Sequence, residues 1–206
     1  MDKKFPKQIP VFPLSGVIYF PKTNLPLNIF EQRYLNLVND AYNGDKLMGM
    51  VQSKKESGSV YQVGCLGKIS DYQKSKDGRI LINLTGISRF KILEEISNDK
   101  LYREFKVDYK DFNEDNIETN NLIDTKSLMD NTKKFFKRNG LLLNWKEFEK
   151  LDQSQKINTL AMIAPITNEE KQKLLESISL KNKVETLESI ISFYLHETNF
   201  NNQTVQ

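Results

Sequence analysis

The sequence predicts an α+β fold, in which a curved, barrel-like β-sheet is followed by a bundle of helices. Two observations predict it. In the first half, apolar residues alternate with polar ones in several short segments, as half-buried strands require, and one helical pattern interrupts them. In the second half, apolar residues recur only at helical spacing. Successive strands with a single early helix favour a curved or barrel-like sheet over a parallel one.

The opening strands are short and rich in proline. Residues 9–14 form an apolar run that includes Pro10 and Pro13, which lack the N–H group that a sheet ladder needs. This run therefore suits an edge strand or the ends of a strand. Residues 25–30 form a second short extended segment.

A helix is predicted directly after the second strand. Several apolar side chains have the spacing of one helical face: Phe30, Tyr34, Leu37, Val38 and Ala41. Gly44 is well placed to end this helix. Glu31 is expected in the first turn, where the helix dipole favours a negative charge.

Strand patterns resume after this helix. Residues 47–51 are compact and apolar, and residues 60–72 form a longer segment in which Gly64 and Gly67 indicate a bulge or bend. The pair Asp77-Gly78 predicts a two-residue hairpin turn. Alternating apolar residues predict the strands that follow the turn: Ile80, Ile82, Leu84, Phe90, Ile92, Ile96, Phe105, Val107 and Tyr109.

A connector separates the two halves. Residues 111–121 are polar and acidic and show no periodicity, which is typical of a linking segment. We therefore predict a β-rich subdomain at residues 1–112 and a helical subdomain at residues 113–206.

The helical half carries clear start and stop signals. Asn139-Gly140 and Pro165 are expected to end helices, and Thr167 with Glu170 has the residue types and spacing of a capping box. The apolar positions at helical spacing are Leu122, Leu128, Met129, Phe135, Phe136, Ile157, Leu160, Ala161, Ala164, Leu174, Leu175, Ile178, Val184, Leu187, Ile191 and Tyr194.

Composition argues against a membrane protein and against strong nucleic-acid binding. The chain has 30 Lys and Arg against 27 Asp and Glu, so its net charge is only +3. No apolar run approaches the roughly 20 residues of a membrane helix, and no signal peptide is visible. A single cysteine excludes an internal disulfide. We expect a cytoplasmic protein.

Motifs for catalysis and cofactor binding are missing. A phosphate-binding loop requires Lys and then Ser or Thr after its last glycine, but the nearest match, which begins at Gly44, continues with Met50 and Val51. Cys65 and His196 are single and far apart in the sequence, so they do not form a zinc ligand set. Cys65 is expected to be a small buried strand residue. We expect no cofactor, no metal and no catalytic residue.

Four motifs occur in order along most of the chain. They are residues 9–14 (IPVFPL) with Phe20-Pro21 and residues 25–34 (LPLNIFEQRY); residues 63–69 (VGCLGKI); Asp77-Gly78-Arg79 with residues 84–90 (LTGISRF); and residues 169–176 (EEKQKLLE). Together they closely resemble the Lon protease N-terminal domain family, over about residues 8–197.

The resemblance implies a pseudo-barrel, PUA-like sheet followed by a helical bundle, and a role in recognising polypeptide. Full-length Lon proteases carry an ATPase module and a Ser–Lys peptidase module after this domain. Neither module is expected in this chain, so the resemblance implies recognition and not proteolysis.

The motif residues also have a structural interpretation. Phe12, Leu14, Leu27 and Phe30 are expected to fill the core of the β subdomain, because large apolar side chains are usually buried. Arg79 and Arg89 could pair with acidic residues, and ion pairs that are exposed contribute little to stability.

The predicted polypeptide-binding residues lie in the loop between the first two strands and at the start of the second strand. Several large apolar groups beside two prolines can form an exposed patch on such a loop. The candidates are Val17, Ile18, Tyr19, Phe20, Pro21, Leu25 and Pro26. The alternative is that these side chains pack under the sheet. A sheet edge could supply the backbone hydrogen bonds for a client segment bound in extended form.

Three hypotheses for function follow. The first is a non-catalytic module for unfolded polypeptide or a partner protein, acting as an adaptor, a holdase-like binder or a regulator in protein quality control. The second is RNA binding, because the family's sheet resembles RNA-recognition folds and one predicted helix carries Lys133, Lys134, Lys137 and Arg138. Without an aromatic nucleic-acid motif, such a charge run is typical of a solvated face, so nucleic acid is not the expected partner. The third is an enzyme with a small-molecule pocket between the subdomains. Self-association through the helical half is compatible with all three, and no membrane contact is expected.

Overall fold

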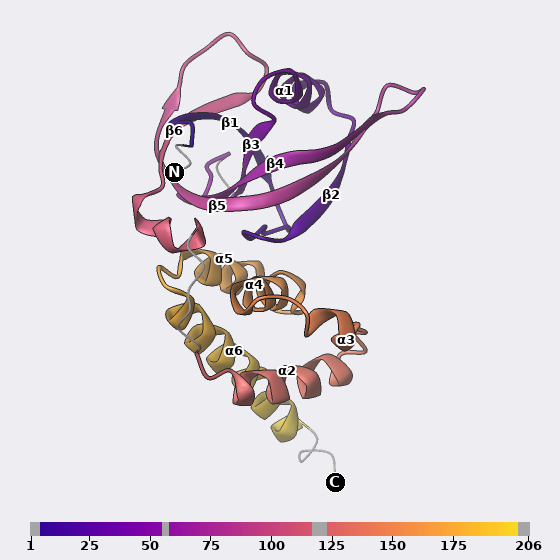
Figure 1. Ribbon diagram of the computed structural model, residues 1–206, viewed down its shortest axis with the longest axis vertical. Coiled ribbons are helices and arrows are strands. Elements are labelled where there is room, and N and C mark those ends of the chain that lie inside the picture. Colours follow the sequence, from indigo (N-terminus) through magenta and orange to yellow (C-terminus); the bar gives the residue numbers. More distant parts are fainter. Residues whose placement is uncertain (1–4, 55–57, 117–122, 202–206) are drawn as a thin grey trace. The chain divides into compact units, whose positions relative to one another are not determined.

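The computed structural model of the protein describes residues 5–54, 58–116 and 123–201 (Figure 1). The chain divides into two compact units, Met1–Ile117 and Glu118–Gln206. The first unit contains β1 Gln8–Leu14, β2 Asn24–Ile29, α1 Gln32–Asn43, β3 Leu47–Gln52, β4 Val63–Lys74, β5 Ile80–Ile96, β6 Arg103–Asp108 and the 3-10 helix η1 Lys110–Asn116. The second contains α2 Lys126–Arg138, α3 Trp145–Phe148, α4 Gln153–Ile163, α5 Asn168–Glu176 and α6 Leu180–Asn201.

The strands of the first unit form one sheet that closes on itself. Their order is β2-β5-β4-β3-β1-β6, and β6 also pairs with β5. The ring therefore runs through β5, β4, β3, β1 and β6, while β2 pairs with the first residues of β5 outside the ring (Figure 1). The strands pair in antiparallel fashion except β1 with β3. The predicted α+β class and the barrel-like sheet are confirmed.

The two longest strands of this sheet, β4 and β5, form a hairpin. The register shifts between Leu66 and Gly67, so the bulge predicted at Gly67 is confirmed. The hairpin turn is also present, but its loop has one residue more than predicted. Ser75 donates its N–H to the carbonyl of Arg79 at 2.8 Å, which leaves three residues in the loop. Gly78 takes a positive φ of 89°, the usual geometry at the end of a three-residue hairpin loop.

Helix α1 packs the predicted face onto the barrel. Its buried residues are Tyr34, Leu37, Val38 and Ala41, and Gly44 ends the helix as predicted. Two expectations at its start are wrong. Glu31 is the N-cap residue and not a first-turn residue. Phe30 does not fill the core, because 65% of its surface is exposed. Ile29 takes the inward position at the end of β2, so the next residue falls on the outward side.

The barrel is filled by apolar side chains from most of its strands. One buried cluster contains Ile9, Val11, Val51, Val60, Leu66, Phe90, Ile92, Phe105 and Val107. Phe12 is buried as expected, whereas Leu14 and Leu27 are only half-buried. Cys65 is fully buried on β4, in agreement with its predicted role.

The segment predicted as a connector is partly structured. Within it, η1 is held against β5 by an ion pair in which Arg89 Nη2 lies 2.8 Å from Asp115 Oδ1. Arg89 therefore pairs with an acid as the sequence suggested, but both side chains are buried, so the argument that an exposed pair contributes little does not apply to it. The predicted boundary between residues 112 and 113 falls inside η1, and the compact first unit extends to Ile117. The exact boundary between the two subdomains stays a prediction.

The second unit is helical, with the predicted caps in place. Thr167 and Glu170 form a reciprocal capping box at the start of α5. Asn139 is the C-cap of α2, and Gly140 has a positive φ of 67°. Helix α2 packs along α6, and α4 and α5 also contact α6 (Figure 1). Their buried apolar residues include Leu128, Phe135, Phe136, Ile157, Leu160, Ala161, Leu174, Leu175, Val184, Leu187 and Ile191.

Two helical predictions have a different outcome. Ile178 does not belong to the face of α5, because that helix ends at Glu176 and Ile178 is exposed. Leu122 lies outside the described residues. Within the described part of the chain, none of the helices combines the length and the apolar character that a membrane span requires.

Candidate polypeptide-binding site

The loop between β1 and β2 does not form the exposed apolar patch that the sequence predicted. Ile18, Tyr19 and Phe20 are buried, and so are Pro21 and Leu25. The alternative, that these side chains pack against the sheet, is therefore what the structure has. Among the seven candidates, Val17 is half-buried and Pro26 is exposed. A binding role for the seven residues stays a prediction. Of the seven, Pro26 is the residue whose side chain is exposed.

Backbone contacts explain why the loop lies against β5. Lys22 donates its N–H to the carbonyl of Gly86 at 2.9 Å, and Gly86 donates to the carbonyl of Thr23 at 2.9 Å. A Cβ atom at Gly86 would lie 2.2 Å from the carbonyl oxygen of Phe20. Only glycine permits this approach, and it fixes the loop against β5. Burial also raises the pKa of the Tyr19 phenol, with a smaller contribution from Cys65.

Strand β2 offers an open edge. Among the residues that the structure describes, it stands at the end of the strand order and pairs only with β5. The Thr23–Gly86 contact and the antiparallel alternation direct the backbone groups of Leu25 and Leu27 toward β5. Those of the intervening residues, Asn24, Pro26 and Asn28, face away from the sheet. Pro26 has no N–H group to donate, and a proline in an edge strand usually occupies such an outward-facing position.

The outward side of β2 and the adjoining part of β5 form a surface that we call the β2 face, made by Pro26, Asn28, Phe30, Leu81 and Asn83. Asn28 and Pro26 are the register partners of Leu81 and Asn83. The face contains a hollow of about 360 Å³ lined by Pro26, Leu27, Asn28, Asp71, Gln73, Leu81, Ile82 and Asn83. Phe30 and Leu81 are exposed by 65% and 42%. The face therefore combines apolar side chains with a strand edge.

Side-chain hydrogen bonds order one border of this face. Thr85 Oγ1 donates to Asn24 Oδ1 at 2.8 Å, which ties β5 to β2. Asn83 Nδ2 donates to Ser70 Oγ at 3.1 Å, and Ser70 Oγ donates to the carbonyl of Asn83 at 3.0 Å, which ties β5 to β4. These bonds hold three strands in register without covering the outer edge of β2.

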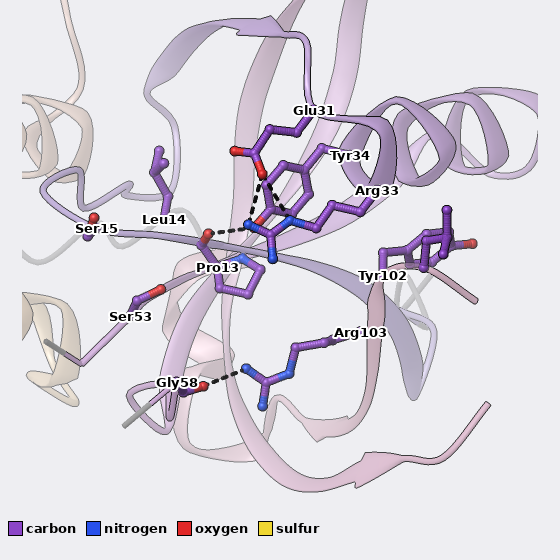
Figure 2. A pocket seen from close by; sticks show the side chains of 11 residues that line it. Pro13, Leu14, Ser15, Glu31, Arg33, Tyr34, Ser53, Gly58, Tyr102 and Arg103 are labelled. Atoms are coloured by element: carbon purple, nitrogen blue, oxygen red, sulfur yellow. Dashed lines mark hydrogen bonds and ion pairs between the residues drawn. The ribbon is translucent and has the colours of Figure 1, made fainter. Parts of the chain in front are cut away.

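A second concave site, the arginine pocket, lies where α1 begins and β6 begins (Figure 2). It has a volume of about 330 Å³ and is lined by Pro13, Leu14, Ser15, Glu31, Arg33, Tyr34, Ser53, Gly58, Leu101, Tyr102 and Arg103. Tyr34 Oη donates to the carbonyl of Pro13 at 3.4 Å, and the guanidinium group of Arg33 lies over the Tyr34 ring. Three segments that are distant in the sequence therefore meet in one pocket.

Ionisation in the arginine pocket is set by its contacts. The hydrogen bonds from Arg103 lower the pKa of Glu95, and the same contacts raise the pKa of Arg103, so this pair stays charged at neutral pH. Burial raises the pKa of the Tyr34 phenol, which stays a neutral donor. In the described ranges, no three His, Cys, Asp or Glu side chains gather as ligands for a metal ion.

The sequence did not single out the most accessible groups of either site. Leu81 lies between two inward-facing isoleucines of β5, so its side chain faces outward. A leucine at an outward position of an alternating strand was the sequence signal for this exposed apolar group. Phe30 was assigned to the core. Arg33 and Arg103 carried no local signal, because the pocket exists only once α1 and β6 are brought together.

The fold resembles two solved N-terminal domains. The N-terminal domain of the Mycobacterium avium complex Lon protease is 18% identical, with 90% of this chain and 98% of that chain covered at a TM-score of 0.66. A Lon N-terminal domain protein from Xanthomonas campestris is 20% identical, with 90% and 97% covered at a TM-score of 0.65. At such low identity, these structures define the class of fold alone.

The sequence identifies the family. Residues 8–192 match the ATP-dependent protease La (LON) substrate-binding domain, and the chain belongs to this family. The Lon protease of Syntrophus aciditrophicus is 27% identical over 211 residues, which cover 93% of this chain and 26% of that protein. The Lon protease of Cytophaga hutchinsonii is 30% identical over 106 residues, which cover 48% and 13%. The chain therefore spans about a quarter or less of these relatives.

Proposed function

We propose that this chain is a non-catalytic module that binds unfolded polypeptide segments along the β2 face. The observation that carries the proposal is membership of the substrate-binding domain family over residues 8–192. The open edge of β2 supports this location, because a sheet edge is where an extended peptide can add as a further strand.

The proposed binding uses both backbone and side chains. The outward N–H groups of Asn24 and Asn28 donate to a client strand, and the carbonyl of Pro26 accepts from it. The missing donor at Pro26 interrupts the ladder, so the edge binds weakly and resists permanent strand addition. Apolar client side chains pack on Phe30 and Leu81. Covering the exposed part of Phe30 contributes about 1.4 kcal/mol, which corresponds to roughly tenfold in affinity.

The basic helix gives RNA binding little support. Lys133 Nζ lies 3.8 Å from a carboxylate oxygen of Glu149 and also lies over the ring of Trp145. Arg138 donates to the carbonyl of Leu195 at 2.9 Å. Two of the four basic side chains are thus engaged within the helical unit. The proposal also includes an adaptor role in protein quality control and a cytoplasmic location.

The test is fluorescence anisotropy with labelled casein, an unfolded polypeptide, against wild-type protein and against Phe30→Ser and Asn28→Pro. Phe30→Ser removes apolar contact and should weaken binding about tenfold. Asn28→Pro removes an outward N–H without touching the ladder to β5, and it should also weaken binding.

Phe193→Ser is the matched control, because Phe193 is exposed by 56% but lies on α6 of the other unit. It should leave casein affinity unchanged. Equal losses from Phe30→Ser and Phe193→Ser would rule out the β2 face. Labelled single-stranded RNA at two salt concentrations is the second ligand: binding of RNA alone, weakening steeply with salt, would favour the RNA hypothesis instead.

A further inference from the structure

The arginine pocket brings together two guanidinium groups from segments far apart in the sequence. Arg33 comes from the first turn of α1, and Arg103 is the first residue of β6. Both side chains extend toward the side of the pocket where Pro13 and Ser53 lie (Figure 2). A guanidinium group presents its N–H donors in a planar fork that matches a carboxylate. The pocket therefore has the donor chemistry of an anion site.

The two arginines are held with different firmness. Arg103 donates from Nε and Nη2 to Glu95 at 2.7 and 2.6 Å, and from Nη1 to the carbonyl of Gly58 at 3.0 Å. Arg33 pairs with Glu31 through a single carboxylate oxygen, at 3.0 Å from Nε and 2.9 Å from Nη2. Both members of that pair are about half exposed, and such pairs contribute little. A ligand carboxylate can therefore replace Glu31 on Arg33.

Charge limits the ligand to one negative group. Glu95 already neutralises Arg103, which leaves Arg33 as the cation whose partner can be exchanged. A doubly charged phosphate would bring two negative charges to this one exchangeable cation, beside the carboxylate of Glu31. A single carboxylate exchanges with Glu31 one for one, so the pocket fits a monoanion.

The pocket also offers apolar surface and a restricted volume. Leu101 is exposed by 61% and Leu14 is half-buried, and both line the pocket. Its volume of about 330 Å³ is near the lower end of the range for small-ligand sites. This space suits the end of a chain better than an extended segment that passes through.

We propose that the arginine pocket binds the free C-terminal carboxylate of a polypeptide whose last side chain is apolar. The inference rests on the proposed function, since it names the part of the polypeptide that is recognised. The carboxylate pairs with Arg33 while Glu31 turns toward solvent. Arg103 stays on Glu95 and forms the fixed wall, and the last side chain packs on Leu101 and Leu14.

The test compares three labelled ten-residue peptides by fluorescence anisotropy. One ends in leucine with a free carboxylate, the second is its C-terminal amide, and the third is an amide with glutamate in place of the last leucine. Wild-type protein should bind the free acid about tenfold more tightly than the first amide, because a charge-assisted hydrogen bond is lost on amidation. Arg33→Gln should remove the difference, whereas Arg138→Gln, at an exposed arginine of the other unit, should preserve it.

Equal affinity for the free acid and its amide would overturn the proposal. Equal affinity for the free acid and the glutamate amide would also overturn it, because the site would then recognise an acidic side chain and not a chain end. Casein binding separates this result from the β2 face. Loss of casein binding in Phe30→Ser, with no discrimination between acid and amide, would leave the proposed function standing and remove the pocket. Discrimination between the free acid and its amide without casein binding would remove the proposal for the β2 face and leave the pocket standing.

Discussion

Replacing Asp115 by alanine should strongly destabilise the β-rich unit. Asp115 accepts from the backbone N–H of Arg89 at 2.8 Å, from Nε at 2.9 Å and from Nη2 at 2.8 Å. The Arg89 side chain is only 2% exposed, so alanine leaves a buried guanidinium group without its carboxylate. Removal of one partner of a buried pair costs about 3–5 kcal/mol. Arg89 also stacks on Phe112, with 4.4 Å between its Cζ atom and the ring centroid, so we expect the lower end of this range.

Urea unfolding followed by circular dichroism and by fluorescence measures this loss. The single tryptophan, Trp145, lies in α3 of the helical unit, so its fluorescence reports that unit separately. Asp77→Ala is the matched control, because Asp77 pairs with Arg79 at 2.7 Å on the exposed surface, and it should cost much less. A double replacement, Arg89→Met with Asp115→Leu, should recover most of the stability. If Asp115→Ala cost no more than Asp77→Ala, the reasoning about the buried charge would be wrong.

Two further predictions concern packing and capping. Gly86→Ala places a Cβ atom 2.2 Å from the carbonyl oxygen of Phe20, which cannot move without displacing the loop. The free energy of unfolding, measured by urea titration, should therefore fall by about 2–3 kcal/mol. An unchanged unfolding midpoint would show that the loop is not fixed on β5. Thr167→Ala removes the capping box of α5 and should cost about 1 kcal/mol, while Thr167→Ser should retain stability; equal losses in both variants would argue against a capping contribution.

Local patterns predicted the elements well where one face of a segment is buried. The face of α1 and its end at Gly44 follow from helical spacing and from a residue without a side chain. The capping box at Thr167 is a contact between residues three apart, so the sequence contains all of it. The hairpin at Gly78 likewise depends on a local turn, although its loop is one residue longer than predicted.

Predictions failed where exposure depends on segments that meet only in the fold. The loop that contains Tyr19 and Phe20 has the composition of an exposed apolar patch and also of a buried one. Its burial is decided by Gly86, which lies far away in the sequence and allows the loop to approach β5. Phe30 has the opposite outcome for the same reason, since its exposure follows from the register of β2 on β5.

The sequence by itself determined the family, the α+β class and the positions of nearly all helices and strands, because these depend on short-range spacing and on motif residues. Only the tertiary structure decided which surfaces are available for binding. The open edge of β2, the exposure of Leu81 and the meeting of Arg33 with Arg103 each require two segments to be placed against one another. Such contacts depend on how distant segments pair and pack, and no single stretch of the chain encodes that arrangement.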